Sequence, residues 1–404
     1  MKCKAICAVV AMLGLAFVCS ASRADDQRIP IKIGVLSVIA AGGADYSGKG
    51  ALVAAHLAVE DFGGNIGGAP IEIINGDTLQ KADIASTIVR EWFDRDNVDV
   101  VVDVPNTSVA LAIMELARER NKVVLVSDAT SMQITGKRCA PTAINWVLDS
   151  YNLAYGTTRA ILKRGVDTWF FSVTDLTFGR DLLNFANQAL KDGGGKSLGY
   201  VTHPYNTPDL SSFLIKAQAS QAKAVALADA PPDNLNAIKQ AREFQIPQGG
   251  QNLIPYILEI TDVHSLGLEV AQGMLLTTGF YWDLDDDTRA FAKRYFERVN
   301  AMPNMFQAGV YSSVLHYLKA VRAANSKDGR TVIAKMRELP VNDFFAKGGR
   351  IREDNRLIYT MYLAQVKTPS ESKYAWDYFN ILSKIPVEEG FLPLTDSECE
   401  FAKK

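Results

Sequence analysis

The chain has 404 residues, of which 48% are hydrophobic and 22% are charged, a composition typical of soluble globular proteins. Lys and Arg number 43 against 45 Asp and Glu, and no long basic block occurs, which argues against nucleic acid as a partner. The length exceeds that of one ordinary hydrophobic core and favours two lobes.

The first residues have the order of a secretory signal. Lys2 and Lys4 precede an apolar run, 5–18, and small residues lead up to Ala24. This order predicts a signal peptide over residues 1–24, cleaved after Ala24. The apolar run is shorter than the ~18 residues of a membrane-spanning helix. We therefore expect export to the periplasm and a mature chain of 380 residues.

The cysteines are consistent with export. Three of the five, Cys3, Cys7 and Cys19, lie within the predicted signal, and a lipoprotein signal at Cys19 is disfavoured by the bulky residues before it. Cys139 and Cys399 remain. Because unpaired thiols are uncommon after export, we expect a disulfide that ties the C-terminal tail to the body, the alternative being two free thiols.

The hydrophobic pattern of the first third alternates between short β-type runs and amphipathic helices. Gly63 and Gly64 stop the first helix before the second strand. Strands are predicted at 31–36, 71–74, 98–104 and 123–126, with helices at 51–62, 82–93 and 109–120.

The same alternation then restarts, which predicts a second parallel sheet. Strands are predicted at 167–173, 196–201 and 224–228, and helices at 180–191, 210–218 and 234–244. A helical block follows at 289–299, 310–324 and 331–338, and then two strand candidates, 357–366 and 374–382.

The fold class is therefore α/β, with two doubly wound parallel-sheet lobes joined by a hinge. The helical block after two finished sheets suggests that the chain returns to the first lobe and then crosses again. We assign residues 29–148 and 282–345 to lobe 1, and 149–281 and 346–404 to lobe 2 and the tail. Ligands of such sheets bind beyond the carboxyl ends of the strands.

One segment resembles a phosphate-binding loop. Residues 43–49 follow a predicted strand and end in Gly48-Lys49. However, Gly50 occupies the position where a Ser or Thr would bind magnesium, and Asp45 would place a negative charge where the loop binds phosphate. The alternative is a ligand-contacting turn at a helix N-terminus. We therefore expect no nucleotide and no other cofactor.

Motifs for metal binding and hydrolysis are missing. The acidic run 285–287 lacks the Gly and Glu of a calcium-binding loop, and no Gly-x-Ser-x-Gly elbow occurs. We expect no metal site and no catalytic residue. The histidines are scattered without ligand spacing, at His56, His203, His264 and His316.

The remaining candidates are polar loops and aromatic residues at the predicted strand ends. Segments 105–108 and 127–131 offer hydroxyl and amide groups that can hold a carboxylate, although simple helix capping is the alternative. Aromatic residues at 178, 280–282 and 306 are placed to line a cleft or to fill the core.

Several segments, taken in their order along the chain, resemble the type I periplasmic binding proteins. The resemblance is specifically to the branched-chain amino acid (leucine/isoleucine/valine) branch of ABC-transporter receptors. The resemblance runs from about Ile31 to the end. It is carried by residues 32–36 with Ser47-Gly48, then by 58–64, 128–131, 238–241, 261–267 and 272–273.

This resemblance implies a set of ligand contacts. A carboxylate would be held by Asn106, Ser108, the Asp128 backbone and the Thr130 hydroxyl. Phe178, Phe306 and the loop at Ala230 would line the cleft, and Tyr46 stands near the place of a displaced aromatic residue. The acid that holds an amino group is matched only loosely, by Glu259 or Asp262, so a carboxylate without an amino group fits as well.

The expected function is that of a periplasmic solute-binding protein of an ABC importer. It would capture a small carboxylate-bearing ligand, an amino acid or an aromatic or organic acid, by closure of two lobes. Membrane permease subunits would be its protein partners. A signalling receptor is the main alternative within the same fold, and an exported α/β enzyme lacks an intact catalytic motif.

Overall fold

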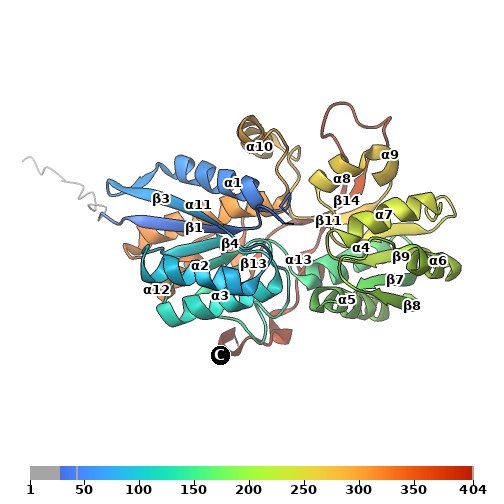
Figure 1. Cartoon of the computed structure of the whole chain (residues 1–404), viewed down its shortest axis with the longest axis horizontal. Helices are drawn as coiled ribbons and strands as arrows, with labels where there is room; N and C mark the ends of the chain where they lie inside the picture. The colour runs from blue at the N-terminus through green and yellow to red at the C-terminus, as the bar shows by residue number, and fades with distance from the viewer. Residues whose placement is uncertain (1–27, 42–43, 403–404) are drawn as a thin grey trace, which may run out of the picture.

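The computed structural model describes residues 28–41 and 44–402. The predicted signal peptide lies outside these residues, and so does Gly43 of the segment that resembles a phosphate-binding loop. Figure 1 shows two α/β halves side by side, with the chain passing several times between them.

The first lobe is built on a sheet in the order β2-β3-β1-β4-β5-β6. All neighbouring strands are parallel except the β2–β3 hairpin. Alternate strand residues enter two separate cores: Val100 and Val102 face one side, and Val101 faces the other. The strands are β1 (Ile31–Ser37), β2 (Asn65–Ile66), β3 (Ala69–Asp77), β4 (Val100–Asp103), β5 (Val123–Val126) and β6 (Ala143–Asn145).

Helices cover both faces of this sheet, as a parallel sheet requires. On one face α1 (Gly48–Phe62) packs against α11 (Met305–Ala324), and on the other α2 (Ala82–Asp94) packs against α3 (Thr107–Arg120). Helix α11 lies about 240 residues after α1 in the sequence, so the chain returns here to the first sheet. Helix α12 (Gly329–Glu338) follows and packs on α11.

The second lobe is built on the parallel sheet β10-β9-β7-β8. Phe171 faces α5, whereas its neighbour Phe170 faces α6 and α7. The elements are β7 (Thr168–Thr174), α5 (Thr177–Gly193), β8 (Lys196–His203), α6 (Ser211–Ala219), β9 (Ala224–Ala228), α7 (Asp233–Glu243) and β10 (Asn252–Pro255), preceded by α4 (Thr157–Leu162).

The two sheets share one topology. The order β3-β1-β4-β5 in the first lobe corresponds to β8-β7-β9-β10 in the second. In each sheet the second of these strands in the sequence lies on one side of the first, and the later strands lie on the other side, so the strand order reverses beside the first strand. The fold class predicted from the sequence is confirmed. Ligand sites in such sheets lie at the reversal, beyond the ends of β1 and β4 and of β7 and β9.

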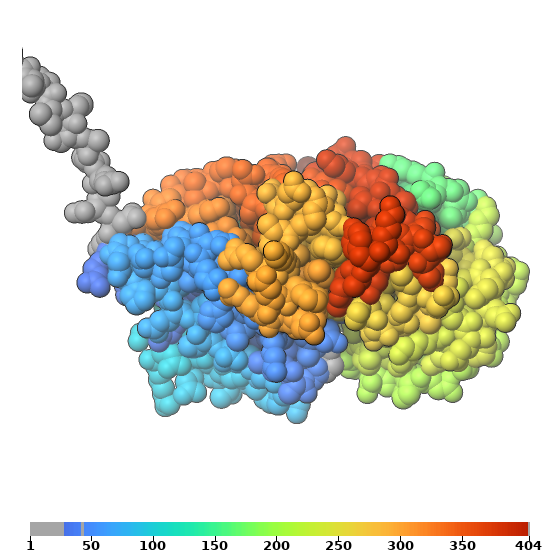
Figure 2. All heavy atoms as spheres, turned by 90° about the horizontal axis from the view of Figure 1, so that it is seen from above, coloured from blue at the N-terminus to red at the C-terminus, as the bar shows by residue number. Residues whose placement is uncertain are grey.

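A third, antiparallel sheet lies at the junction. It pairs β11 (Leu275–Thr278) with β14 (Met361–Val366), and β14 with β15 (Phe379–Ile385). The hairpin of β12 (Arg350–Ile351) and β13 (Leu357–Ile358) lies instead beside β6, through a bridge between Arg356 and Asn145. Seen from above, α10 (Asp286–Val299) and the segment near residue 370 meet over the junction (Figure 2).

Two predicted strands are corrected. The run 357–366 is two strands in two different sheets, because the chain passes between the lobes at Tyr359 and Thr360. The candidate 374–382 becomes a strand only at Phe379. Before it, the carbonyl of Trp376 accepts a hydrogen bond from the Trp282 indole (2.9 Å), which holds this segment as a loop.

The predicted disulfide is confirmed. Cys139 and Cys399 are bonded, with 5.6 Å between their Cα atoms, and Cys399 is fully buried. The bond attaches the C-terminal tail to the first lobe, although the strand before it, β15, belongs to the junction sheet. The part of the chain that the structure describes contains no helix both long and apolar enough for a bilayer span.

Candidate functional site

The loops that follow the central strands of both sheets meet at the junction. From the first lobe come the loops after β1, β4 and β5. From the second lobe come the loops after β7, β9 and β10, the last of which enters α8 (Ile260–Leu266). This is the position where the paired reversal points predict a site.

The loop after β4 has an unusual backbone. Asp103, Val104 and Asn106 have φ angles of 76°, 61° and 26°, a left-handed region that residues other than glycine rarely adopt. Such strain persists where the surroundings impose it, and it clusters at binding loops. Here the buried Asp103 carboxylate anchors the loop by accepting hydrogen bonds from Ser37 (2.7 Å) and from Ser47.

Asn106 and Ser108 serve mainly to start α3. The Asn106 side chain accepts a hydrogen bond from the Val109 amide (3.1 Å) and donates to the Gln80 side chain (2.5 Å). The Ser108 hydroxyl is exposed and donates to Asn106 (2.8 Å). Capping, the alternative noted from the sequence, is what these side chains do. The backbone amides of this helix start remain suited to an anion.

The loop after β5 is hydrogen-bonded to the end of β4 and the loop that follows it. The Asp128 amide donates to the Asp103 carbonyl (3.2 Å), and the Ala129 amide donates to the Val104 carbonyl (3.2 Å). The Asp128 amide is therefore engaged within the first lobe, and it is the half-buried side chain of this residue that remains for other contacts. Thr130 is buried, and its carbonyl accepts the Ser150 amide (2.7 Å).

Tyr46 and Asp262 join the two lobes directly. The Tyr46 hydroxyl, in the loop after β1, donates to the Asp262 carboxylate on α8 at 2.5 Å. The Tyr46 ring stacks on Phe306 with 5.6 Å between ring centroids, and both rings are buried. Three predicted site residues from distant parts of the sequence therefore lie together.

Glu259 lies beside this contact. It caps α8 in a reciprocal arrangement with Asp262, whose carboxylate accepts the Glu259 amide (2.8 Å). One Glu259 carboxylate oxygen accepts the Met305 amide (3.3 Å). The other, Oε1, is buried and has no hydrogen-bond partner among the described residues. An unpartnered buried carboxylate oxygen is costly and is the kind of group that a ligand can satisfy.

The site is electrostatically negative. Burial, and then the charge of Asp262, raises the pKa of Glu259 well above its ordinary value. Burial raises the pKa of Asp262 to about 6, against the opposing hydrogen bond from Tyr46. Burial and then Asp103 raise the pKa of Asp128. The charges that act on these groups are other carboxylates, so the site favours protons or a positively charged group.

The second lobe adds Phe178 and Ala230. Phe178 is half-buried at the start of α5, packed against the core, and Ala230 follows β9, where its amide donates to the Thr174 hydroxyl (3.1 Å). Gly179 is required beside Phe178, since a Cβ there would lie 2.2 Å from the Thr174 carbonyl oxygen. The end of β7 and the start of α5 are thus held in close contact.

Other residues at the junction were not identified from the sequence. Burial raises the pKa of Asp181 on α5, and the nearby Ser131 hydroxyl after β5 opposes that rise. Asn304 caps α11, and its amide group donates to the carbonyls of Asp45 (3.0 Å) and Tyr46 (3.2 Å). Asn304 with Gln307 forms a capping box before an apolar helix, a pattern that sequence reading can detect. Nothing in the sequence pairs Ser131 with Asp181.

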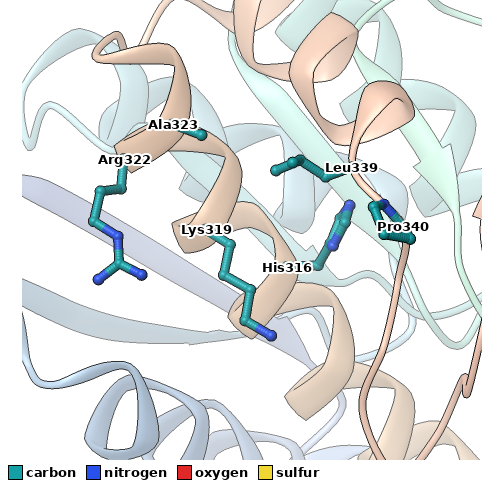
Figure 3. Close-up of a pocket in the computed structure, with 6 residues that line it drawn as sticks. All are labelled: His316, Lys319, Arg322, Ala323, Leu339 and Pro340. Carbon is teal, nitrogen blue, oxygen red and sulfur yellow. The ribbon is translucent and has the colours of Figure 1, made fainter.

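A surface hollow of about 580 Å³ lies elsewhere (Figure 3). His316, Lys319 and Arg322 of α11 line it, together with Leu339 and Pro340. None of these is a residue of the strand-end loops, so this hollow is separate from the candidate site. Among the described residues, no three His, Cys, Asp or Glu side chains are arranged to hold a metal ion.

Comparisons with known proteins agree with this arrangement. A family model described as periplasmic binding protein matches residues 30–373. A periplasmic binding protein from Burkholderia mallei is 42% identical, with a TM-score of 0.87 over 92% of this chain and 99% of that chain. A branched-chain amino acid ABC transporter periplasmic ligand-binding protein from Burkholderia xenovorans is 39% identical, with a TM-score of 0.87 over 92% and 100%.

More distant structures share the fold. A solute-binding protein of an ABC transporter from Rhodopseudomonas palustris, solved with 3,4-dihydroxybenzoic acid, is 21% identical, with a TM-score of 0.80 over 88% of this chain and 97% of that chain. A search of curated protein sequences gave no match. From its two matching sheets, its strand-end site and the family match over most of its length, this chain belongs to the periplasmic binding proteins.

Proposed function

We propose that this protein is the solute-binding component of an ABC importer and that it captures a small ligand between its two lobes. The observation that carries the proposal is the hydrogen bond across the junction between Tyr46, in the loop after β1, and Asp262, on the helix that follows β10. The name of the Burkholderia xenovorans relative supports a transport role.

The ligand that fits best carries both an amino group and a carboxylate. The hydrogen bonds from Tyr46 and from the Glu259 amide both go to Oδ2 of Asp262, whereas Oε1 of Glu259 is buried and has no hydrogen-bond partner among the described residues. We therefore assign the ligand's ammonium to Glu259 rather than to Asp262. The helix start at Ser108 and the Thr130 hydroxyl would hold the carboxylate. Tyr46, Phe178, Phe306 and Ala230 would surround the side chain.

A carboxylate without an amino group is the second candidate. The raised pKa of Glu259 favours a protonated, neutral acid that could donate a hydrogen bond to such a ligand. Aromatic acids would also suit the rings of Tyr46 and Phe178. The distant Rhodopseudomonas palustris structure, solved with a hydroxybenzoic acid, shares the fold with this chain.

A solute-binding role has consequences for the location of the protein, its partners and its chemistry. The mature chain would act in the periplasm after removal of residues 1–24, deliver its ligand to membrane permease subunits, and carry out no catalysis. The division into residues 29–148 with 282–345 and 149–281 with 346–404 is a proposal as well. The contacts of β12, β13 and Cys399 with the first lobe support moving those segments to it.

A thermal-shift screen tests the proposed function. The mature protein is unfolded and refolded to remove carried-over ligand, and L-leucine, L-phenylalanine and their counterparts without the amino group are added. A ligand at ~1,000 times its dissociation constant stabilises the folded state by ~4 kcal/mol and raises the unfolding midpoint by several degrees. Shifts with amino acids alone support the assignment of Glu259. Shifts with the bare acids alone would favour the second candidate, and no shift would count against both.

A further inference from the structure

His203 lies at the end of β8 and is fully buried with two polar partners. Its Nδ1 is 3.0 Å from the Pro204 carbonyl oxygen, and its Nε2 is 2.9 Å from Oδ1 of Asp229. Both partners are hydrogen-bond acceptors when Asp229 is ionised. A neutral imidazole donates from one nitrogen only, so it would turn a lone pair toward one of them. The doubly protonated ring satisfies both.

The groups around the ring favour the cation. Asp229 follows β9 and Asp233 starts α7, and these carboxylates are the charged groups that act on His203. From α6 the Phe213 ring lies 5.5 Å away, and from β7 the Ser172 hydroxyl donates to Asp229 (3.4 Å). Burial by itself lowers the pKa of His203, but the hydrogen bond and charge of Asp229, together with the Pro204 carbonyl and the charge of Asp233, outweigh it and leave the pKa raised.

Asp229 needs such a partner. Burial raises the pKa of its carboxyl, and the hydrogen bond and charge of His203 oppose that rise. Its second oxygen, Oδ2, is buried without a hydrogen-bond partner among the described residues. An ionised Asp229 without the imidazolium would be an uncompensated buried charge, which is strongly unfavourable.

The pair is connected to the candidate site through Ala230 and Asn234. Asp229 precedes Ala230, whose amide is bonded to Thr174 (3.1 Å) and whose carbonyl accepts the Asn234 amide (3.2 Å). The Asn234 side chain in turn donates to the Ile257 carbonyl (2.6 Å), two residues before Glu259. A series of contacts therefore runs from His203 to two second-lobe loops of the site, those after β9 and β10.

We propose that His203 is a positioning residue for the ligand site: as an imidazolium it holds Asp229 and, through it, the loops that carry Ala230 and Glu259. The ring touches no ligand itself. The inference rests on the proposed function only in calling these loops ligand-binding. If His203 loses its proton at high pH, both loops lose their support and the site loosens.

The pH dependence has a definite sign. A histidine whose pKa is raised by folding contributes stability that is complete below its unfolded pKa of about 6.5 and is lost as the pH rises through the folded value. The unfolding midpoint of the ligand-free protein should therefore fall between pH 6 and pH 9 more steeply in the wild type than in a variant without the titrating pair.

The test is nuclear magnetic resonance of the ligand-free mature protein. The ring nitrogens of His203 should titrate with a midpoint above the ~6.5 of an ordinary histidine. On raising the pH, the amide signals of Ala230 and Glu259 should move with the midpoint of the His203 ring. His316 is the matched control: it is buried, has one acceptor, the Met336 carbonyl (2.9 Å), and burial lowers its pKa to about 4, so it should be neutral.

Two variants complete the test. His203→Gln should abolish the pH-dependent movement of both amides, whereas His316→Gln should preserve it. If His203→Gln does not fold, the double variant His203→Gln/Asp229→Asn keeps a neutral hydrogen-bonded pair and should fold with pH-independent amides. A His203 ring that titrates at or below ~6.5, or amide signals of Ala230 and Glu259 that do not change as the ring titrates, would overturn the proposal. Either result can be read even if no ligand is found in the screen.

Discussion

Glu259 is the residue on which the identity of the ligand depends. It is 3% exposed, one of its oxygens is unpartnered, and its neighbours Asp262 and Asp128 are acids. Because burial and then the charge of Asp262 raise its pKa, we expect Glu259 to bind a proton more readily than an ordinary glutamate before the ligand binds. An ammonium ligand favours the ionised form, so binding should release that proton. A carboxylate without an amino group gives no reason for the release.

This predicts a buffer-dependent heat of binding. Calorimetric titration of the amino acid that gives the largest thermal shift, at pH 6.5 in two buffers of different ionisation enthalpy, should show proton release by the wild type. Glu259→Gln should remove the release and weaken binding about 10- to 100-fold, the worth of one hydrogen bond to a charged group. Glu72→Gln, on the exposed edge of β3, is the matched control and should match the wild type. Unchanged affinity in Glu259→Gln would argue against the assignment.

At the level of elements, an N-cap residue can hold a loop of the site as well as start its helix. Asn304 caps α11 by accepting the Gln307 amide (3.0 Å), and it also holds the loop of Asp45 and Tyr46. Asp328 caps α12 by accepting the Thr331 amide (2.9 Å), on the first lobe and outside the strand-end loops. The two caps are chemically similar but differ in their relation to the site.

Comparing these caps gives a second prediction. Asn304→Ala and Asp328→Ala should each lower the free energy of unfolding by about 1 kcal/mol, the usual cost of an N-cap. Only Asn304→Ala should also weaken ligand binding, because only it releases the Tyr46 loop. Chemical denaturation and calorimetric titration measure the two effects. Equal affinity in both variants would mean that the Tyr46 loop does not depend on Asn304.

Most elements could be predicted because their periodicity is local. The strand at 123–126 and the strand at 224–228 coincide with β5 and β9, and Gly63 ends α1 as expected. Short elements near the site were missed. β10 and β11 have four residues each, and α8 has seven, too few for a period to be recognised. Their place is fixed by tertiary contacts, such as the pairing of β11 with β14.

The site was predictable in its residue types and less so in their roles. Tyr46, Phe306, Glu259 and Asp262 lie together in the structure. The engagement of the Asp128 amide by Asp103 could not be foreseen, since it depends on the left-handed backbone of the neighbouring loop. The choice between Glu259 and Asp262 likewise rests on which carboxylate oxygen is left free.

At the scale of the whole molecule, the tail and the hinge form one unit. Arg356, buried between the lobes, donates to Asp149 (2.7 Å) and to the Val147 carbonyl (2.9 Å), and its guanidinium lies over Phe391 (5.1 Å to the ring centre). The Lys163–Glu389 ion pair (2.7 Å) attaches the tail to α4, and Cys399 attaches it to Cys139. The tail therefore spans the junction and is fixed on both sides.

The Cys139–Cys399 disulfide should stabilise the folded protein. Cys139 and Cys399 are 260 residues apart, and closing so long a loop restricts the unfolded chain. Cys139→Ser/Cys399→Ser should lower the free energy of unfolding by about 2–5 kcal/mol and leave the fold intact. Denaturation of the double variant and of the wild type with and without reductant measures this. A double variant as stable as the oxidised wild type would show that the bond adds no stability.

Closure of the lobes on a ligand is the central claim, and small-angle scattering of the mature protein tests it most directly. The structure has Tyr46 bonded to Asp262, which is the closed arrangement. We expect the refolded, ligand-free protein to be more extended than this structure, and the amino acid identified by thermal shift to bring its scattering into agreement with it. A ligand that raises the unfolding midpoint but leaves the scattering unchanged would contradict the account.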